Sequence, residues 1–163
     1  MKIGIIGDIH FSEYSSILRD RGHKFSARLE NCVASINWAE QVTEMCDQIV
    51  YLGDFFDKST LNAEELTALS YIKWNSRYHR FLVGNHEMGI NTLEYSSAHI
   101  LDLGVNGEVV DKAYLSFYDE GTELCFLPYI LEADRKPLSE YFREKSGYRR
   151  IIFSHNDIAG IQM

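Results

Sequence analysis

Acidic, amide and imidazole side chains gather at four points of the sequence, each directly after an apolar run. Such groups, without thiolates, are ligands that suit divalent manganese, iron or zinc. Two such ions, held roughly 3.5 to 4 Å apart, can clamp a phosphate ester and activate a water molecule. The four groups are Asp8-Ile9-His10, Gly53-Asp54-Phe55-Phe56-Asp57, Gly84-Asn85-His86-Glu87 and Ser154-His155. The sequence therefore predicts a site for two divalent metal ions with the candidate ligands Asp8, His10, Asp54, Asn85 and His155.

The order of these groups suggests how the ligands divide between the two ions. Asp54 is the candidate bridge, because one carboxylate can bind two ions at once. Asp8 and His10 lie two positions apart, so they point to the same side of an extended segment and can bind one ion together. Asn85 and His155 are then left for the second ion.

His86 directly follows Asn85 and is expected to point toward the substrate. An imidazole beside two cations can stabilise the charge that develops on a phosphate, or protonate the leaving oxygen. Asp57 is the candidate group that orients this imidazole, as carboxylates commonly do for histidines near metals. We therefore predict that His86 and Asp57 are catalytic. Glu87 either does similar work or accepts hydrogen bonds from its loop.

Each group taken alone has a more ordinary interpretation. Asp-x-His after a strand is often a turn with a surface pair, and Gly-Asp-x-x-Asp can be a turn with a helix cap. Gly-Asn-His-Glu can be an ordinary strand-to-helix turn, and His155 can be a polar strand end. Four such groups at four strand ends are an improbable coincidence, which favours the metal site.

The apolar runs before these groups are the elements that must position them. Their β-branched and aromatic residues predict buried strands at residues 2–7, 48–52, 79–83 and 150–153. Helical spacing over residues 26–46 predicts a crossover that makes the second strand parallel to the first. The carboxyl ends of parallel strands share one edge of a sheet, so the four groups are expected to meet there.

Other segments are expected to complete a single α/β domain over residues 1–163. Residues 11–24 predict a long loop beside the site. Residues 114–118 and 123–127 predict a hairpin, since alternating runs flank a turn that contains glycine. Further helices are expected over residues 63–74, with Asn62 among the candidate caps, over residues 92–103 and over residues 132–145.

Composition and charge exclude several classes of protein. The 163 residues are 45% hydrophobic and 25% charged, which is typical of a globular domain. The formal net charge of -8 argues against broad electrostatic attraction to nucleic acid, although metal ions can neutralise an acidic cleft locally. The three cysteines are widely spaced, which favours reduced thiols. Without a signal peptide or an apolar span, we expect a cytoplasmic protein with no membrane contact.

The ordered set of four groups resembles the calcineurin-like metallophosphoesterase superfamily over nearly the whole chain. This resemblance implies a four-layer α/β/β/α sandwich and a two-metal hydrolase in which the motif residues have the roles given above. Residues 53–59 and the segment Phe126-Leu127-Pro128-Tyr129-Ile130 are most similar to the SbcD/Mre group of DNA-repair nucleases. That similarity implies manganese as the metal, with iron or zinc as alternatives, DNA as the substrate, and an SMC-like ATPase subunit of the SbcC type as a partner.

Two features depart from the nuclease group. Its members usually have Asp after Gly-Asn-His, whereas Glu87 is more common in protein serine/threonine phosphatases; those phosphatases, however, have Arg-Gly where this chain has Lys58-Ser59. The superfamily also closes its site with a Gly-His-x-His motif, and none follows His155. The remaining histidines are not convincing replacements: His23 in a loop, and His79 and His99, which are expected to be structural.

We therefore expect a carboxy-terminally incomplete domain, without its last strands and any capping domain. An uncovered sheet edge would favour self-association. Three functions follow for comparison: a DNA exonuclease or endonuclease, a phosphoprotein or small-molecule phosphatase, and an inactive fragment or assembly module that needs a missing segment.

Overall fold

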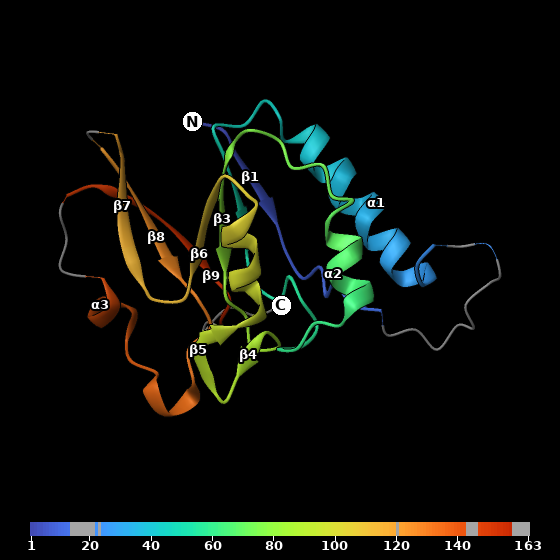
Figure 1. Cartoon of the computed structure of the whole chain (residues 1–163). Coiled ribbons are helices and arrows are strands. Elements are labelled where there is room, and N and C mark those ends of the chain that lie inside the picture. The colour runs from blue at the N-terminus through green and yellow to red at the C-terminus, as the bar shows by residue number, and fades with distance from the viewer. Residues whose placement is uncertain (14–21, 23, 120, 143–146, 158–163) are drawn as a thin grey trace.

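A computed structural model describes residues 1–13, 22, 24–119, 121–142 and 147–157 (Figure 1). In this part of the chain, one sheet has the order β1-β2-β3-β6 and all of its neighbouring strands are parallel. Its strands are β1 (Ile3–Ile6), β2 (Gln48–Tyr51), β3 (Tyr78–Leu82) and β6 (Gly107–Val110). The predicted parallel pairing of the first strands is thus confirmed, whereas β6 was not foreseen.

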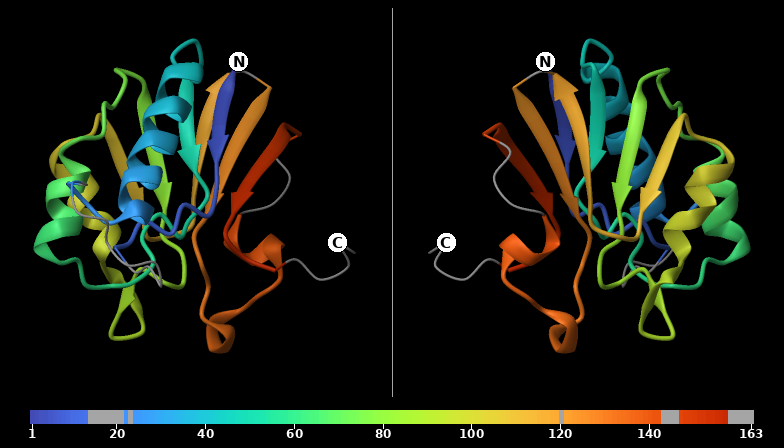
Figure 2. Two further views of the ribbon diagram at one scale, coloured as in Figure 1. Left: turned by 90° about the vertical axis from the view of Figure 1, so that its right-hand side faces the viewer. Right: turned by 90° about the vertical axis from the view of Figure 1, so that its left-hand side faces the viewer.

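The second sheet has the order β7-β8-β9. Its strands β7 (Tyr114–Asp119) and β8 (Thr122–Leu127) form the predicted hairpin, and β9 (Arg149–Ser154) pairs parallel to β8. The fourth strand predicted from the sequence therefore belongs to this second sheet. The arrowheads of β1, β2, β3 and β9 nevertheless point toward the same end of the molecule (Figure 2).

The two sheets pack face to face through a shared apolar layer. This layer joins Val50, Leu82 and Val110 of the first sheet to Leu124, Phe126 and Phe153 of the second. Strand β2 is buried at every position, as expected for a parallel strand that is covered on both faces. The packing of the sheets therefore brings the end of β9 to the ends of β1, β2 and β3.

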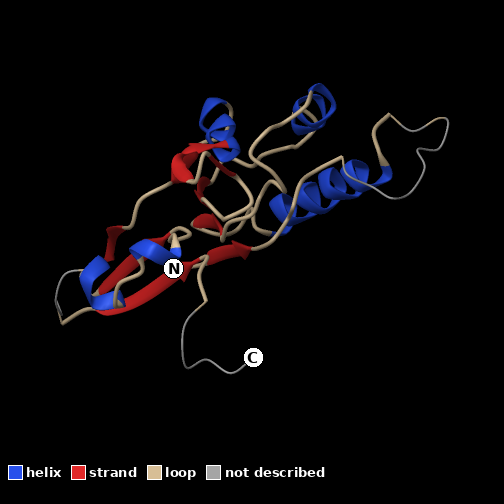
Figure 3. Ribbon diagram, turned by 90° about the horizontal axis from the view of Figure 1, so that it is seen from below, coloured by secondary structure: helices blue, strands red, loops and turns tan. Residues whose placement is uncertain are grey.

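Helices cover the outer face of the first sheet. Helix α1 (Ala27–Val42) begins at Ser26, whose side chain accepts a hydrogen bond from the Leu29 N–H. Helix α2 (Ala63–Leu69) begins at Asn62, which forms a capping box with Glu65. Both helices contribute to a core with β2 and β3, whose buried members include Leu29, Ile36, Ile49, Tyr51, Phe55, Ala68 and Phe81. Figures 1 and 3 show α1 and the second sheet on opposite sides of the molecule.

Three predicted helices differ from the structure. Residues 92–103 form β5 (Thr92–Ser96), which pairs with β4 (Met88–Gly89), and a 3-10 helix η1 (Ser97–Leu103). The reason is a tight turn at Ile90 and Asn91, both of which have positive φ. The helix expected over residues 63–74 ends at Leu69, after which the backbone makes shorter-range bonds such as Ile72 N–H to Leu69 O.

The third difference concerns residues 132–145. The structure has a 3-10 helix η2 (Glu132–Asp134) and a short helix α3 (Leu138–Tyr141), separated by Pro137. Proline lacks an N–H and disfavours helical backbone in the preceding residue, so it divides the segment. Residues 143–146 lie outside the described part. The end of α3 packs on the outer face of the second sheet through Tyr141 and Phe142, next to Cys125.

Two further expectations bear on the fold. The loop expected over residues 11–24 is described only in part, because residues 14–21 and 23 are outside the described residues. Among the described residues, no helix is long and apolar enough to cross a membrane.

A buried carboxylate joins α1 to the first sheet. The Glu40 side chain, 1% exposed, accepts hydrogen bonds from Tyr51 Oη at 2.6 Å, His79 Nε2 at 2.9 Å and the Asn75 N–H at 3.1 Å. Burial acts to raise the pKa of Glu40, but the hydrogen bonds from His79 and Tyr51 outweigh it and leave the pKa below its ordinary value. His79 is therefore a structural residue, as expected.

We predict that Glu40→Gln lowers the free energy of unfolding by about 2 kcal/mol at neutral pH, because a charge-accepting hydrogen-bond network is weakened. The carboxyl pKa is lower in the folded state than in the unfolded state, so this stability is present above the ordinary pKa of 4.5 and is lost as the pH falls through the folded value. Urea unfolding between pH 3 and pH 7 measures the difference. Equal curves for the two proteins at every pH would contradict the assignment, and Glu44→Gln, in the exposed turn after α1, is the control.

Candidate metal centre

The backbone that carries the candidate ligands adopts an uncommon conformation. Asp8, His10 and Asp54 each have a φ of 48°, and Gly53 has a φ of 107°. Side chains in this left-handed region cost roughly 1 to 3 kcal/mol each and are found mainly where function requires them. The loops after β1 and β2 hold one another through the His10 N–H to Asp54 O at 2.9 Å and the Phe11 N–H to Phe55 O at 2.7 Å.

The first predicted ligand group comes together. One donor atom each from Asp8, His10 and Asp54 lies within 4.8 Å of the others. Asp54 is buried, His10 is half-buried and Asp8 is exposed, so the group opens to solvent on one side. The three donor atoms therefore lie close enough to share one ion, although Asp8 and His10 reach this position from left-handed backbone and not from the extended segment that the sequence predicted.

The second group forms around the same carboxylate. His155 Nε2 lies 3.1 Å from Asp54 Oδ2 and 3.1 Å from Asn85 Oδ1. His155 Nδ1 lies 2.8 Å from Leu52 O, so a proton on Nδ1 would be donated to this carbonyl and Nε2 would face Asp54 and Asn85. Asp54 therefore lies next to members of both groups, and its bridging of two ions stays a prediction.

Asp54 and His155 each stabilise the charged form of the other. Burial acts to raise the pKa of Asp54, but hydrogen bonds from His155 and from the His86 N–H outweigh it and hold the pKa below its ordinary value. Burial likewise acts to lower the pKa of His155, and the Asp54 carboxylate outweighs it and raises this pKa. Asp54 is thus held as a carboxylate, which is the form that binds metal.

His86 and Asp57 lie next to His10: one donor atom from each of the three residues lies within 4.8 Å of the others. The His86 N–H donates to Asp54 Oδ1 at 3.0 Å, and the His86 imidazole is 43% exposed. Asp57 Oδ1 is 3.7 Å from His86 Nδ1 but 3.1 Å from His10 Nδ1. Asp57 is therefore closer to His10 than to the imidazole that it was predicted to orient. The imidazole rings of His10 and His86 lie edge to face, with centroids 4.8 Å apart.

The side chain of Glu87 links the loop after β2 to the loop after β3. Its side chain is fully buried and accepts hydrogen bonds from the Phe56 N–H and the Gly84 N–H, both at 2.9 Å. Burial raises the pKa of Glu87 to about 7. Glu87 thus accepts a hydrogen bond from its own loop, which is one of the two roles predicted for it. It also accepts a hydrogen bond from the loop after β2. An acid after Gly-Asn-His was the sequence signal.

Two further supports were missed from the sequence. The buried Glu65 side chain accepts the Glu13 N–H at 3.0 Å and pairs with Lys58 Nζ at 2.9 Å, so it ties the loops after β1 and β2 to α2. Arg28 Nη2 donates to the carbonyl oxygen of His10 at 3.1 Å. The sequence does not predict these contacts of Glu65 and Arg28, because each contact depends on packing between segments that are far apart in the chain.

Gly84 is required for the close approach of two loops. A Cβ at this position would overlap the side-chain Oδ1 and the backbone nitrogen of Asp54. We predict that Gly84→Ala lowers the free energy of unfolding by about 1 to 3 kcal/mol, as overpacking does elsewhere, and weakens Mn²⁺ binding because Asp54 is displaced. Urea unfolding and calorimetric titration measure the two effects. Gly104→Ala is the control, since nothing lies within 4 Å of its added Cβ; equal effects of the two changes would contradict the prediction.

The residues present fit the binding of divalent metal ions. The donors are carboxylates, imidazoles and an amide, which suit manganese, iron or zinc, and they fall into two groups that share Asp54. The other histidines do not join them in the described residues. His79 binds Glu40, and His99 Nδ1 lies 3.3 Å from Asp102 Oδ2. His23 lies outside the described part of the chain.

Comparisons with known proteins identify the family. The model of the calcineurin-like phosphoesterase family matches residues 1–161. No curated protein sequence matches the chain at a significant level. Among solved structures, a protein of unknown function from Aquifex aeolicus (AQ665) is similar with a TM-score of 0.43 and 17% identity, over 86% of this chain and 66% of that one. The match of the family model extends over all four candidate groups, and the chain belongs to the calcineurin-like phosphoesterase family.

Proposed function

We propose that this site hydrolyses a phosphodiester in DNA with two manganese ions. Membership of the family makes the chain a metal-dependent phosphoesterase in general terms. The observation that carries the proposal is the position of Asp54 next to members of two ligand groups, with the exposed imidazole of His86 beside it. Two adjacent ions are the arrangement that suits in-line displacement at a phosphate ester.

Asp8, His10 and Asp54 would hold one ion, and Asp54, Asn85 and His155 the other. Bound there, the ions would supply positive charge beside a phosphate and lower the pKa of a water molecule. The protein keeps Asp54 ionised and holds its loop through Glu87 and Gly84. His86 is held through its N–H, and its Nδ1 lies 3.4 Å from Asp57 O. The imidazole is 43% exposed and would donate a proton to a leaving oxygen.

The choice of DNA rests on the resemblance of residues 53–59 and 126–130 to the SbcD/Mre nucleases. An SMC-like ATPase subunit of the SbcC type is the partner that this choice implies. With a net charge of -8, the chain would contact DNA locally and chiefly through the metal centre. Its DNA affinity is therefore expected to depend on Mn²⁺ more than on salt concentration.

A substrate panel with Mn²⁺ tests this function. We expect hydrolysis of bis(p-nitrophenyl) phosphate and of short DNA duplexes, and little hydrolysis of p-nitrophenyl phosphate. EDTA is expected to abolish all of it, and Mn²⁺ to restore it. Preferential hydrolysis of the monoester, or of a phosphopeptide, would refute the nuclease assignment.

A phosphatase is the second candidate, because Glu87 occupies the position after Gly-Asn-His. The same panel separates it from the nuclease.

Assembly is a third candidate, and exposed apolar side chains on the edge strands support it: Ile5 of β1 is 58% exposed and Ile152 of β9 is 41% exposed. Light scattering tests self-association through these edges, and a monodisperse monomer that binds two Mn²⁺ ions tightly would refute an inactive assembly module.

A further inference from the structure

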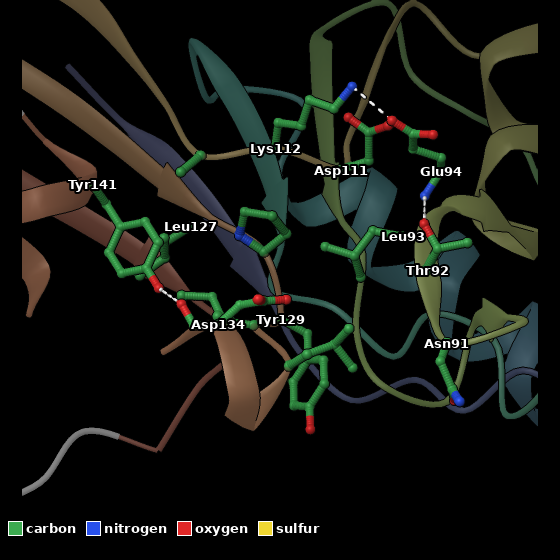
Figure 4. Close-up of a pocket in the computed structure, with 14 residues that line it drawn as sticks. Asn91, Thr92, Leu93, Glu94, Asp111, Lys112, Leu127, Tyr129, Asp134 and Tyr141 are labelled. Atoms are coloured by element: carbon green, nitrogen blue, oxygen red, sulfur yellow. Dashed lines mark hydrogen bonds and ion pairs between the residues drawn. The ribbon is translucent and has the colours of Figure 1, made fainter. Parts of the chain in front are cut away.

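A pocket lies between the β4–β5 hairpin and the segment that follows β8 (Figure 4). It encloses about 290 Å³, close to the lower limit of roughly 300 Å³ for small-molecule sites in proteins. The β4–β5 side contributes Leu93 and Glu94, and the other side contributes Leu127, Tyr129 and Ile130. None of the candidate metal ligands lines it, so it is a separate feature of the surface.

Tyr129 connects this pocket to the metal centre. Tyr129 is one of the residues that line the pocket, and the centroid of its ring is 6.5 Å from that of the His155 ring. The Tyr129 N–H donates to Val83 O at 2.8 Å, directly before Gly84 and Asn85. Tyr129 thus lies between the pocket and the second ligand group. If a phosphate ester binds at the metal centre, a group attached to its phosphate has this pocket next to it.

The walls of the pocket suit a flat, uncharged group. Leu93, Leu127 and Ile130 are apolar, and Tyr129 and Tyr141 supply aromatic rings. The Tyr141 hydroxyl donates to Asp134 O at 2.7 Å, so this ring is held in place. Stacking of a base on an aromatic side chain is worth about 1 to 3 kcal/mol and needs no particular sequence.

The polar residues of the pocket favour a ligand that donates hydrogen bonds. Three of them are acidic, namely Glu94, Asp111 and Asp134. The one lysine among the lining residues, Lys112, already pairs with Glu94 at 3.0 Å. An anion would therefore be repelled, whereas carboxylates accept hydrogen bonds from an amino group such as that of cytosine.

We propose that this pocket binds a nucleobase of the substrate, and prefers bases that carry an exocyclic amino group. This inference rests on the proposed function, since it assigns the pocket to a substituent of the phosphodiester. The Tyr129 ring is the stacking surface and the acidic side chains are the acceptors. The phosphate stays at the metal centre, outside the pocket.

Binding of nucleosides without metal tests the pocket by itself. Saturation-transfer NMR with the protein in EDTA is expected to show binding of deoxycytidine and deoxyadenosine, weaker binding of thymidine, and none of deoxyribose 5-phosphate. Tyr129→Ala is expected to weaken deoxycytidine binding at least about fivefold. Tyr95→Ala is the control, because this tyrosine of β5 is 66% exposed and does not line the pocket.

Tyr129→Leu guards against a loss of folding, because it keeps an apolar side chain and removes the aromatic face. Circular dichroism and urea unfolding establish that each variant is folded. A folded Tyr129→Leu protein that binds deoxycytidine as tightly as the unmodified protein would overturn the proposal. Binding of deoxyribose 5-phosphate as tight as that of deoxycytidine would also overturn it.

Kinetics with Mn²⁺ separate this proposal from the proposed function. We expect Tyr129→Ala to lower kcat/KM at least about fivefold more for the p-nitrophenyl ester of deoxycytidine 5′-monophosphate than for methyl p-nitrophenyl phosphate. Equal losses for both esters would count against base binding. If the unmodified protein hydrolyses neither ester, the proposed function fails, and the nucleoside titration in EDTA still decides whether the pocket binds a base.

Discussion

Asp54→Asn is expected to reduce Mn²⁺-dependent hydrolysis of bis(p-nitrophenyl) phosphate by more than about 100-fold. Loss of a residue that merely supports a metal ligand costs 10-fold to 100-fold, and Asp54 belongs directly to both ligand groups. The amide has nearly the same shape but carries no charge and cannot bridge two ions. Calorimetric titration is expected to show weaker binding of both Mn²⁺ ions.

Asp47→Asn is the matched control. Asp47 lies at the opposite end of β2 and accepts a hydrogen bond from the Lys2 N–H at 2.7 Å. It is expected to leave hydrolysis and Mn²⁺ binding unchanged. An Asp54→Asn protein that is folded and keeps more than a tenth of the activity would show that the bridging carboxylate lies elsewhere.

His86→Gln has the second largest expected effect, a fall in kcat of about 10² to 10⁴ when a proton must be transferred to the leaving group. His86 contributes its N–H to Asp54, and this backbone bond survives the substitution. Binding of Mn²⁺ is therefore expected to remain within a fewfold of the unmodified protein. Parallel measurements of kcat and of Mn²⁺ affinity separate a catalytic role from a ligand role.

The leaving group provides an internal check on His86. p-Nitrophenolate leaves readily without a proton, whereas a nucleoside alkoxide does not. His86→Gln is thus expected to slow DNA cleavage more than hydrolysis of bis(p-nitrophenyl) phosphate. Equal losses on both substrates, accompanied by weak Mn²⁺ binding, would instead make His86 a metal ligand. His99→Gln, remote from the candidate groups, is the control.

Local patterns in the sequence were sufficient for the strands and their polar ends. Residues 49–51 are all apolar because β2 is covered on both faces. That pattern is visible without a structure. Residues 92–103 misled the prediction, because their apolar spacing is compatible with a helix. The turn at Ile90 and Asn91 and the pairing of β4 with β5 overrode this local preference.

The sequence by itself determined the family, the parallel strands β1, β2 and β3, and the candidate ligands at their ends. Each of these follows from short motifs and from continuous apolar runs along the chain. Only the tertiary structure decided that His155 arrives from a second sheet, that Asp57 lies nearer His10 than His86, and that Glu87 joins two loops from a buried position. These contacts depend on how segments far apart in the chain pack together, and no local pattern records that packing.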